Sequence, residues 1–136
     1  MFKFRGGGTA VPDELLFQDG SGAEVGTAAS FRDPSAWYHV VVAVDTTQAT
    51  STNRVKIYFN GVQQTISGTY STYPTQNLSM QINAAQIHGI GEDTWDSTPR
   101  FDGYLAEINF IDGQALTPSY FGQFDAITGV WRPTGY

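Results

Sequence analysis

Short apolar runs separated by turn residues extend along most of the chain. The run from Tyr38 to Asp45 is apolar on both faces, whereas Val55, Ile57 and Phe59 alternate with Lys56 and Tyr58. Alternation with a period of two is typical of a strand with one buried face, and a short β-branched run is typical of a strand buried on both sides. The pattern therefore predicts two strands, the first of them in the centre of a sheet.

Further strands are predicted around these two. Asn60-Gly61 is the strongest hairpin signal in the chain. The run from Phe101 to Ile111 is a second strong strand, in which Tyr104, Ala106, Ile108 and Phe110 share one face. Weaker strands are expected over Glu14 to Gln18, Glu24 to Phe31, Val62 to Ile66, Leu78 to Ile82 and Gln86 to Ile90.

The segments between the strands are polar and rich in turn residues. Residues 67–77 and 91–100 are expected to be loops, and Thr117-Pro118 predicts one short helical turn, with a cap residue followed by proline. Residues 130–136 form a C-terminal tail that is ordered only if Trp131 docks. We expect the other large aromatics to lie in the core: Trp37, Phe59, Phe101 and Phe110. Turn signals about every eight to twelve residues in an all-β chain are typical of a sandwich or barrel.

Composition supports one folded β domain over residues 1–136. Aromatic residues make up 14% of the 136 residues and charged residues only 15%, against about 25% charged residues in an average globular protein. So many bulky apolar groups argue against disorder, and the abundance of Gly, Thr, Ser, Tyr and Phe argues against a helical bundle. No repeat or domain boundary divides the chain.

Charge and the missing cysteines exclude several classes of function. The net charge is −6, and the 7 Lys and Arg residues are scattered, so no basic stripe is available to bind nucleic acid. The longest apolar run, Val40 to Val44, is too short to insert through a membrane. The absence of Cys excludes a thiolate nucleophile, a Cys-ligated zinc, an iron–sulfur cluster and a disulfide framework.

Three segments resemble a known family. Residues 31–45 contain Trp-Tyr-His-Val ahead of Val-Asp, residues 54–62 contain Val-Lys-Ile-Tyr-Phe-Asn-Gly, and residues 101–118 begin with Phe-Asp-Gly and continue into Ala-Glu-Ile. Together they resemble the laminin-G-like branch of the concanavalin A-like jelly rolls, over residues 31–132. The resemblance implies an all-β antiparallel β-sandwich of jelly-roll type.

The beginning of the chain departs from the family pattern. Members of this branch usually carry more strands before the position of Phe31, including one rich in Trp, whereas residues 1–30 are Gly-rich and contain no Trp. Two interpretations stay open: a minimal sandwich with a truncated N-terminal strand set, or a sandwich completed by a partner. We expect residues 1–13 to form an N-terminal arm, of which Met1 to Gly8 dock on a neighbouring subunit.

The particular form of these motifs is similar to versions in tail-fibre and other virion proteins of marine bacteriophages. The resemblance implies a non-enzymatic structural or adhesion module on the particle exterior, in contact with other virion subunits and forming a homo-oligomer. A capsid or fibre assembly protein without a glycan ligand is the alternative. No nucleic-acid partner and no membrane insertion are expected.

Aromatic residues in the predicted rim loops are candidates for glycan binding. Tyr70, Tyr73 and Trp95 lie in polar stretches, and Asp93 could supply hydrogen bonds to sugar hydroxyls. Flat aromatic faces stack on sugar rings. The same residues could instead cap the core or contact other subunits, because Tyr and Trp are also typical of interfaces.

A cluster of carboxylates is a candidate calcium site. Asp93, Asp96 and Asp102, with Glu92, are oxygen ligands of the kind that Ca²⁺ prefers, and laminin-G-like domains often hold calcium at a sandwich rim. Their spacing fits no EF-hand loop, and Asp is also common in turns for local hydrogen bonding. No other cofactor is expected.

The chain lacks the motifs of a hydrolase. Jelly-roll glucanases carry paired acids on one strand, and here Glu107 stands alone between Leu105 and Asn109. His39 and His88 lie far apart, and no nucleophile elbow accompanies either of them. We therefore expect no enzymatic activity, with a glucanase-like hydrolase as the distant alternative.

Overall fold

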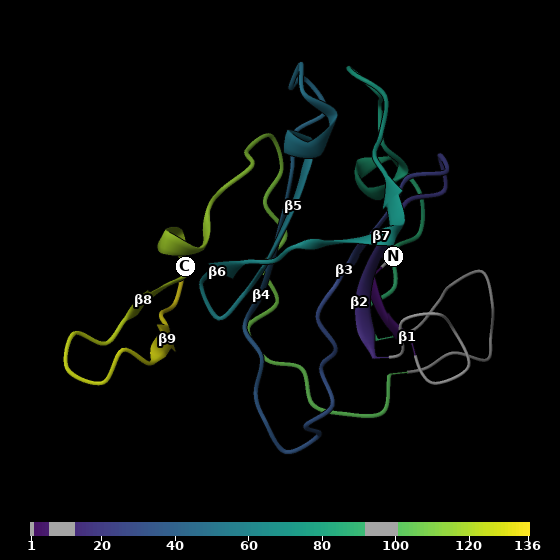
Figure 1. Ribbon diagram of the computed structural model, residues 1–136. Coiled ribbons are helices and arrows are strands. Elements are labelled where there is room, and N and C mark those ends of the chain that lie inside the picture. Colours follow the sequence, from purple (N-terminus) through teal and green to yellow (C-terminus); the bar gives the residue numbers. More distant parts are fainter. Residues whose placement is uncertain (1, 6–12, 92–100) are drawn as a thin grey trace.

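The computed structural model describes residues 2–5, 13–91 and 101–136, which form antiparallel sheets and single turns of 3-10 helix (Figure 1). One sheet has the order β1-β2-β3-β7 and a second the order β4-β5-β6, while β8 and β9 form a hairpin. The strands are β1 (Phe2–Arg5), β2 (Glu14–Gln18), β3 (Glu24–Thr27), β4 (Val40–Val44), β5 (Val55–Phe59), β6 (Val62–Gln63), β7 (Ile66–Thr72), β8 (Gly122–Phe124) and β9 (Trp131–Pro133). The helical turns are η1 (Ser51–Asn53), η2 (Gln81–Asn83) and η3 (Pro118–Tyr120).

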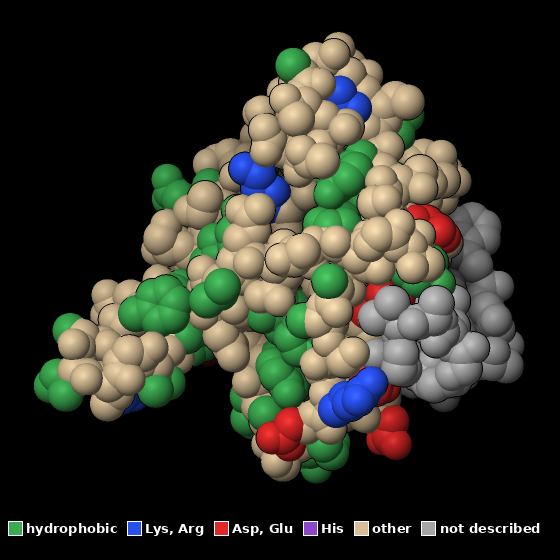
Figure 2. All heavy atoms as spheres, in the orientation of Figure 1, with side chains coloured by type: hydrophobic (Ala, Val, Ile, Leu, Met, Phe, Trp, Pro, Cys, Tyr) green, Lys and Arg blue, Asp and Glu red, His purple; other side chains and the backbone are tan. Residues whose placement is uncertain are grey.

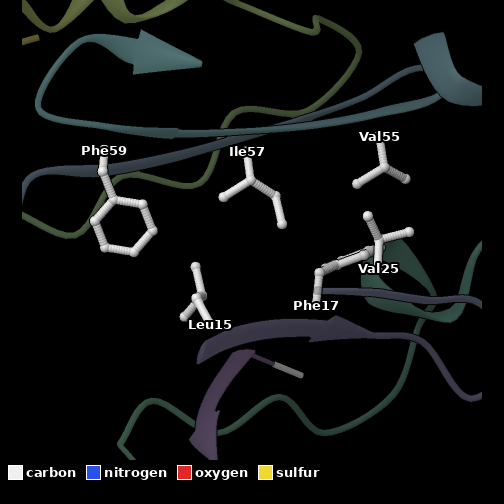
Figure 3. Packing of buried hydrophobic residues seen from close by; sticks show 6 residues of the cluster. All are labelled: Leu15, Phe17, Val25, Val55, Ile57 and Phe59. Atoms are coloured by element: carbon white, nitrogen blue, oxygen red, sulfur yellow. The ribbon is translucent and has the colours of Figure 1, made fainter. Parts of the chain in front are cut away.

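The core lies between the two larger sheets. Its buried side chains come from alternate positions on β2, β3 and β5 and point toward one another (Figure 3). They are Leu15, Phe17, Val25, Val55, Ile57 and Phe59. The alternation predicted for β5 and the burial predicted for Phe59 are confirmed, and the sheets pack face to face.

Aromatic rings close one end of this core. Phe31 stacks on Phe59 with ring centroids 3.7 Å apart, and Tyr38 meets both rings edge to face. Each such pair contributes about 0.5–1.5 kcal/mol beyond the apolar area that it buries. The turn before β4 is therefore held against the end of β5.

The Asn60-Gly61 hairpin is confirmed. Both residues have positive φ, 46° and 79°, as the favoured two-residue hairpin turn requires. The Asn60 side chain accepts a hydrogen bond from the His39 backbone N–H at 2.9 Å, and the Asn60 N–H donates to the His39 carbonyl at 2.8 Å. This turn therefore also fixes the residue that precedes β4.

The prediction that residues 38–45 form a central strand is wrong in its placement. Among the described residues, β4 pairs only with β5 and forms the edge of its sheet, with side chains that are half-buried or exposed. The strand expected from Phe101 to Ile111, which could have covered that edge, is not formed. Glu107 has a φ of 51°, in the left-handed region, so the extended conformation is interrupted there.

Two other expectations about strands and loops are corrected. Residues 67–72 belong to β7, which pairs with β3, although their polar composition predicts a loop. The runs from Leu78 to Ile82 and from Gln86 to Ile90 form no strands; η2 begins within the first run, at Gln81. The buried Asp19 side chain accepts the Gln81 backbone N–H at 3.1 Å, a contact that favours a turn at this point.

The chain ends are more ordered than expected. β1 pairs along its whole length with β2, from Phe2 opposite Phe17 to Arg5 opposite Glu14, so residues 2–5 belong to the chain's own sheet. The prediction of an arm that docks on a neighbouring subunit is therefore not met by residues 2–5. Met1 and residues 6–12 lie outside the described residues. The short helical turn predicted at Thr117-Pro118 is confirmed as η3. A jelly-roll connection of the strands stays a prediction.

Candidate functional site

A wide, open hollow runs beside β4. Its lining comes from the segment around Trp37 and His39, from residues 78–91 and 101–116, and from part of the C-terminal hairpin. Residues 101–111 belong to this lining and form no strand.

Several large aromatic side chains that line this hollow are mostly exposed. Trp37 is 67% exposed and Tyr104 is 86% exposed. The sequence predicts Trp37, Phe101 and Phe110 as core residues, and the structure corrects this by leaving all of them exposed. None of the three lies in a strand. These aromatics thus offer flat apolar faces to a ligand.

Several carboxylates that line the hollow already hold turns together. Asp33 accepts hydrogen bonds from the Ser35 hydroxyl at 2.6 Å and from the Ser35 N–H at 2.9 Å, and these bonds lower the pKa of Asp33. The Thr47 hydroxyl and the Gln48 amide lower the pKa of Asp45 in the same way. These two carboxylates are therefore structural groups.

Asp102 and Glu107 differ from the turn carboxylates. Both are exposed, both line the hollow, and neither has a side-chain hydrogen bond or ion pair with another described residue. Carboxylate oxygens accept hydrogen bonds from hydroxyl groups. These two side chains are therefore available to a ligand in the hollow.

The structure describes only some of the residues that are predicted to bind a glycan. Tyr70 lies half-buried on β7, where its Cβ is 3.0 Å from the position that a Cβ on Gly26 would take. Tyr73 packs against the core, and burial raises its pKa. Asp93 and Trp95 lie outside the described residues. As ligand-binding residues, all four stay predictions.

The calcium prediction rests on residues that the structure covers only in part. Glu92, Asp93 and Asp96 lie outside the described residues, and Asp102 is exposed. Within the described ranges, no group of three or more His, Asp or Glu residues could hold a metal ion. The Phe101 N–H donates to the Gly91 carbonyl at 2.7 Å, so the two ends of the intervening segment meet beside Asp102.

The two histidines have separate surroundings. The Nδ1 atom of His39 lies 3.1 Å from the indole Nε1 of Trp131, and partial burial lowers the pKa of His39. The Nδ1 atom of His88 lies 2.8 Å from the Gln86 carbonyl. His39 is therefore partly packed, and its contact with Trp131 shows that the tryptophan is docked.

Comparison with protein families decides the identity of the fold. Residues 2–120 match a laminin-G-like family described as the concanavalin A-like lectin/glucanases superfamily. The chain belongs to this superfamily. The description of this superfamily names lectins and glucanases. Searches of curated proteins and of solved structures give no match.

The extent of the match divides the concanavalin A-like domain from the C-terminal hairpin. Strands β1 to β7 lie inside the matched residues, whereas β8 and β9 lie beyond residue 120. No helix in the described part of the chain is long and apolar enough to cross a membrane.

Proposed function

We propose that this concanavalin A-like domain is a non-catalytic carbohydrate-binding module. The observation that supports it is the pair of exposed aromatics, Trp37 and Tyr104, in the same hollow as the unengaged carboxylates of Asp102 and Glu107. Aromatic faces pack against the apolar faces of sugar rings, while the carboxylates accept hydrogen bonds from the hydroxyls.

The charge of the hollow favours a neutral glycan. Its lining includes one guanidinium, that of Arg32, and this group is paired with Asp13. The carboxylates of the lining are those of Asp13, Asp19, Asp33, Asp45, Asp102, Glu107 and Asp112. An excess of one sign repels ligands of the same sign, so sulfated or uronate-rich glycans are disfavoured.

We place the module on the exterior of a bacteriophage particle, as part of a fibre or of the surface. The resemblance of residues 31–45 and 101–118 to tail-fibre and other virion proteins supports this location and an assembly with other subunits. Rim residues Tyr70, Tyr73, Asp93 and Trp95 are proposed to extend the glycan contact.

An assembly role without a glycan ligand is the second candidate. Exposed apolar side chains outside the aromatic pair favour it, above all Ile127, which is 96% exposed, and Ile87. Figure 2 shows apolar side chains on the surface of the projecting C-terminal hairpin, at the left of the view. Exposed apolar surface is typical of protein–protein contact sites. A glucanase-like activity remains the distant candidate, because no second acid stands at an alternate position beside Glu107, as the paired acids of a glucanase would.

Glycan binding tests the proposal directly. The measurement is binding of the purified protein to an array of neutral and acidic glycans, followed by titration calorimetry with the best neutral ligand. Trp37→Ala and Tyr104→Ala should each weaken binding about tenfold or more, because covering an aromatic face contributes about 1.5 kcal/mol or more. Tyr120→Ala is the matched control, because Tyr120 is exposed but does not line the hollow.

Three results would contradict the proposal. They are no binding to any glycan at millimolar concentration, an equal loss of binding in the Tyr120→Ala control, and release of new reducing ends from a bound glycan. The last result would indicate an enzyme.

A further inference from the structure

The C-terminal hairpin is attached to the domain through one tryptophan. The ring of Trp131 on β9 packs against the Cα of Gly61 in the β5–β6 turn, and a Cβ on Gly122 would lie 2.6 Å from its Cζ2 atom. Phe124 meets the same ring edge to face at 5.0 Å. In Figure 1 the hairpin projects away from the two larger sheets, so this docking point determines where it lies.

One side-chain hydrogen bond joins Trp131 to the body of the domain. Indole Nε1–H can only donate, so the Nδ1 atom of His39, 3.1 Å away, must accept. An imidazole accepts at Nδ1 only when it is neutral and carries its proton on Nε2. Protonated imidazole has a hydrogen on both nitrogens, so two N–H groups would face each other and the bond would be lost.

We propose that His39 and Trp131 form a pH-sensitive latch, in which protonation of His39 releases the β8–β9 hairpin from the Asn60-Gly61 turn. Phe124, Val130 and Trp131 line one end of the hollow beside β4. Release of the hairpin therefore changes the shape of that end, and its effect on glycan binding rests on the proposed function.

No charged group in the described part of the chain lowers or raises the pKa of His39 as a counter-ion would. On the hairpin, Arg132 is paired with Asp125 at 2.8 Å. The other ionisable groups on the segments that pack here are Arg32, Asp33 and Tyr38 before β4, Asp45 after it, and Lys56 and Tyr58 on β5. None of them shifts the pKa of His39, which is lowered by desolvation.

The direction of the pH effect follows from this lowered pKa. A docked His39 takes up a proton less readily than a free histidine, whose pKa is about 6.5. Docking is therefore fully stable above about pH 6.5 and weakens as the pH falls through the lowered value. Hydrogen bonds from Thr128 and Ile127 lower the pKa of Asp125, so that carboxylate stays ionised in the same range.

The indole proton of Trp131 reports the latch. Its resonance in ¹H–¹⁵N spectra is identified by its absence in Trp131→Phe and is followed from pH 7.5 to pH 4.5. In the wild-type protein we expect its resonance to shift, and its exchange with water relative to that of a free indole at the same pH to become faster, by up to about tenfold for each pH unit below the ordinary pKa of histidine. His39→Gln keeps an acceptor oxygen and cannot titrate, so its Trp131 indole should stay unchanged, whereas the His88→Gln control should behave as the wild type.

An indole signal of Trp131 that is independent of pH in the wild-type protein would overturn the latch. So would the same transition in His39→Gln. Neutral-glycan binding, measured at pH 7.5 and pH 5.0 in both proteins, tests the coupling to the hollow. A pH-dependent indole signal without glycan binding at either pH contradicts the proposed function and leaves the latch intact. Glycan binding without a pH-dependent indole signal contradicts the latch and leaves the proposed function intact.

Discussion

Gly61 has two separate reasons to be glycine. Its φ of 79° lies in the left-handed region, and the Trp131 ring occupies the space into which a Cβ would project. Gly113 has a similar φ of 74° but nothing within 4 Å of the Cβ position. A comparison of these two glycines therefore separates the backbone effect from the contact.

Gly61→Ala should destabilise the protein more than Gly113→Ala. A left-handed conformation costs about 1–2 kcal/mol for a residue with a Cβ, and both variants bear that cost. Gly61→Ala must also displace Trp131, so we expect at least about 1 kcal/mol more loss in the free energy of unfolding by urea denaturation. Equal losses in the two variants would show that the indole does not pack on Gly61.

The Arg54 side chain donates hydrogen bonds to backbone carbonyls instead of pairing with a carboxylate. Its guanidinium donates to the carbonyls of Gln48 and Ala49, both at 2.8 Å, and to that of Pro74 at 2.9 Å. These bonds fasten the loop between β4 and β5 to the segment after β7. A planar fork with several donors is suited to this arrangement, whereas an ammonium group is not.

Arg54→Lys should therefore lower the free energy of unfolding by about 1–2 kcal/mol, because at least two hydrogen bonds are lost. Arg32→Lys is the control. Arg32 forms one exposed ion pair with Asp13, with exposed side-chain fractions of 65% and 35%, and such pairs contribute about 0–1 kcal/mol. A loss in Arg54→Lys no greater than in Arg32→Lys would contradict the role assigned to Arg54.

At the scale of elements, Asp19 connects the turn after β2 to η2. Its buried carboxylate accepts the N–H of Gln81 at 3.1 Å and the N–H of Ser21 at 3.2 Å. Asp19→Ala leaves both donors without this partner and should cost about 1–3 kcal/mol of unfolding free energy. Asp19→Asn retains one acceptor oxygen and should cost less; thermal unfolding of the two variants gives the comparison. A larger loss in Asp19→Asn would refute this interpretation.

The elements that the sequence predicts well are those with their own local signal. β5 has an alternating apolar face, and the Asn60-Gly61 turn has two residues that tolerate positive φ. β7 is not predicted because Ser67, Thr69 and Ser71 give no apolar alternation; its strand state comes from pairing with β3. Residues 101–111 have the alternation, but pairing with a neighbouring strand is not encoded in a local pattern.

At the scale of the whole molecule, the family can be predicted and the site only in part. The motifs in residues 31–62 and 101–118 indicate a concanavalin A-like domain, and the match over residues 2–120 confirms it. The sequence assigns Trp37 and Tyr104 to a core or a strand, because hydrophobicity alone does not show which large side chain remains uncovered. The turn residues Asp33-Pro34 just before Trp37 are the available signal for exposure.

The hydrogen bond between the Phe101 N–H and the Gly91 carbonyl has a consequence for how this chain can vary. It holds Gly91 and Phe101 together, although nine positions separate them in the sequence. Doubling the length of a flexible loop costs only about 0.6 kcal/mol in closure entropy. An insertion between Gly91 and Phe101 that keeps this hydrogen bond should therefore leave the sheets folded.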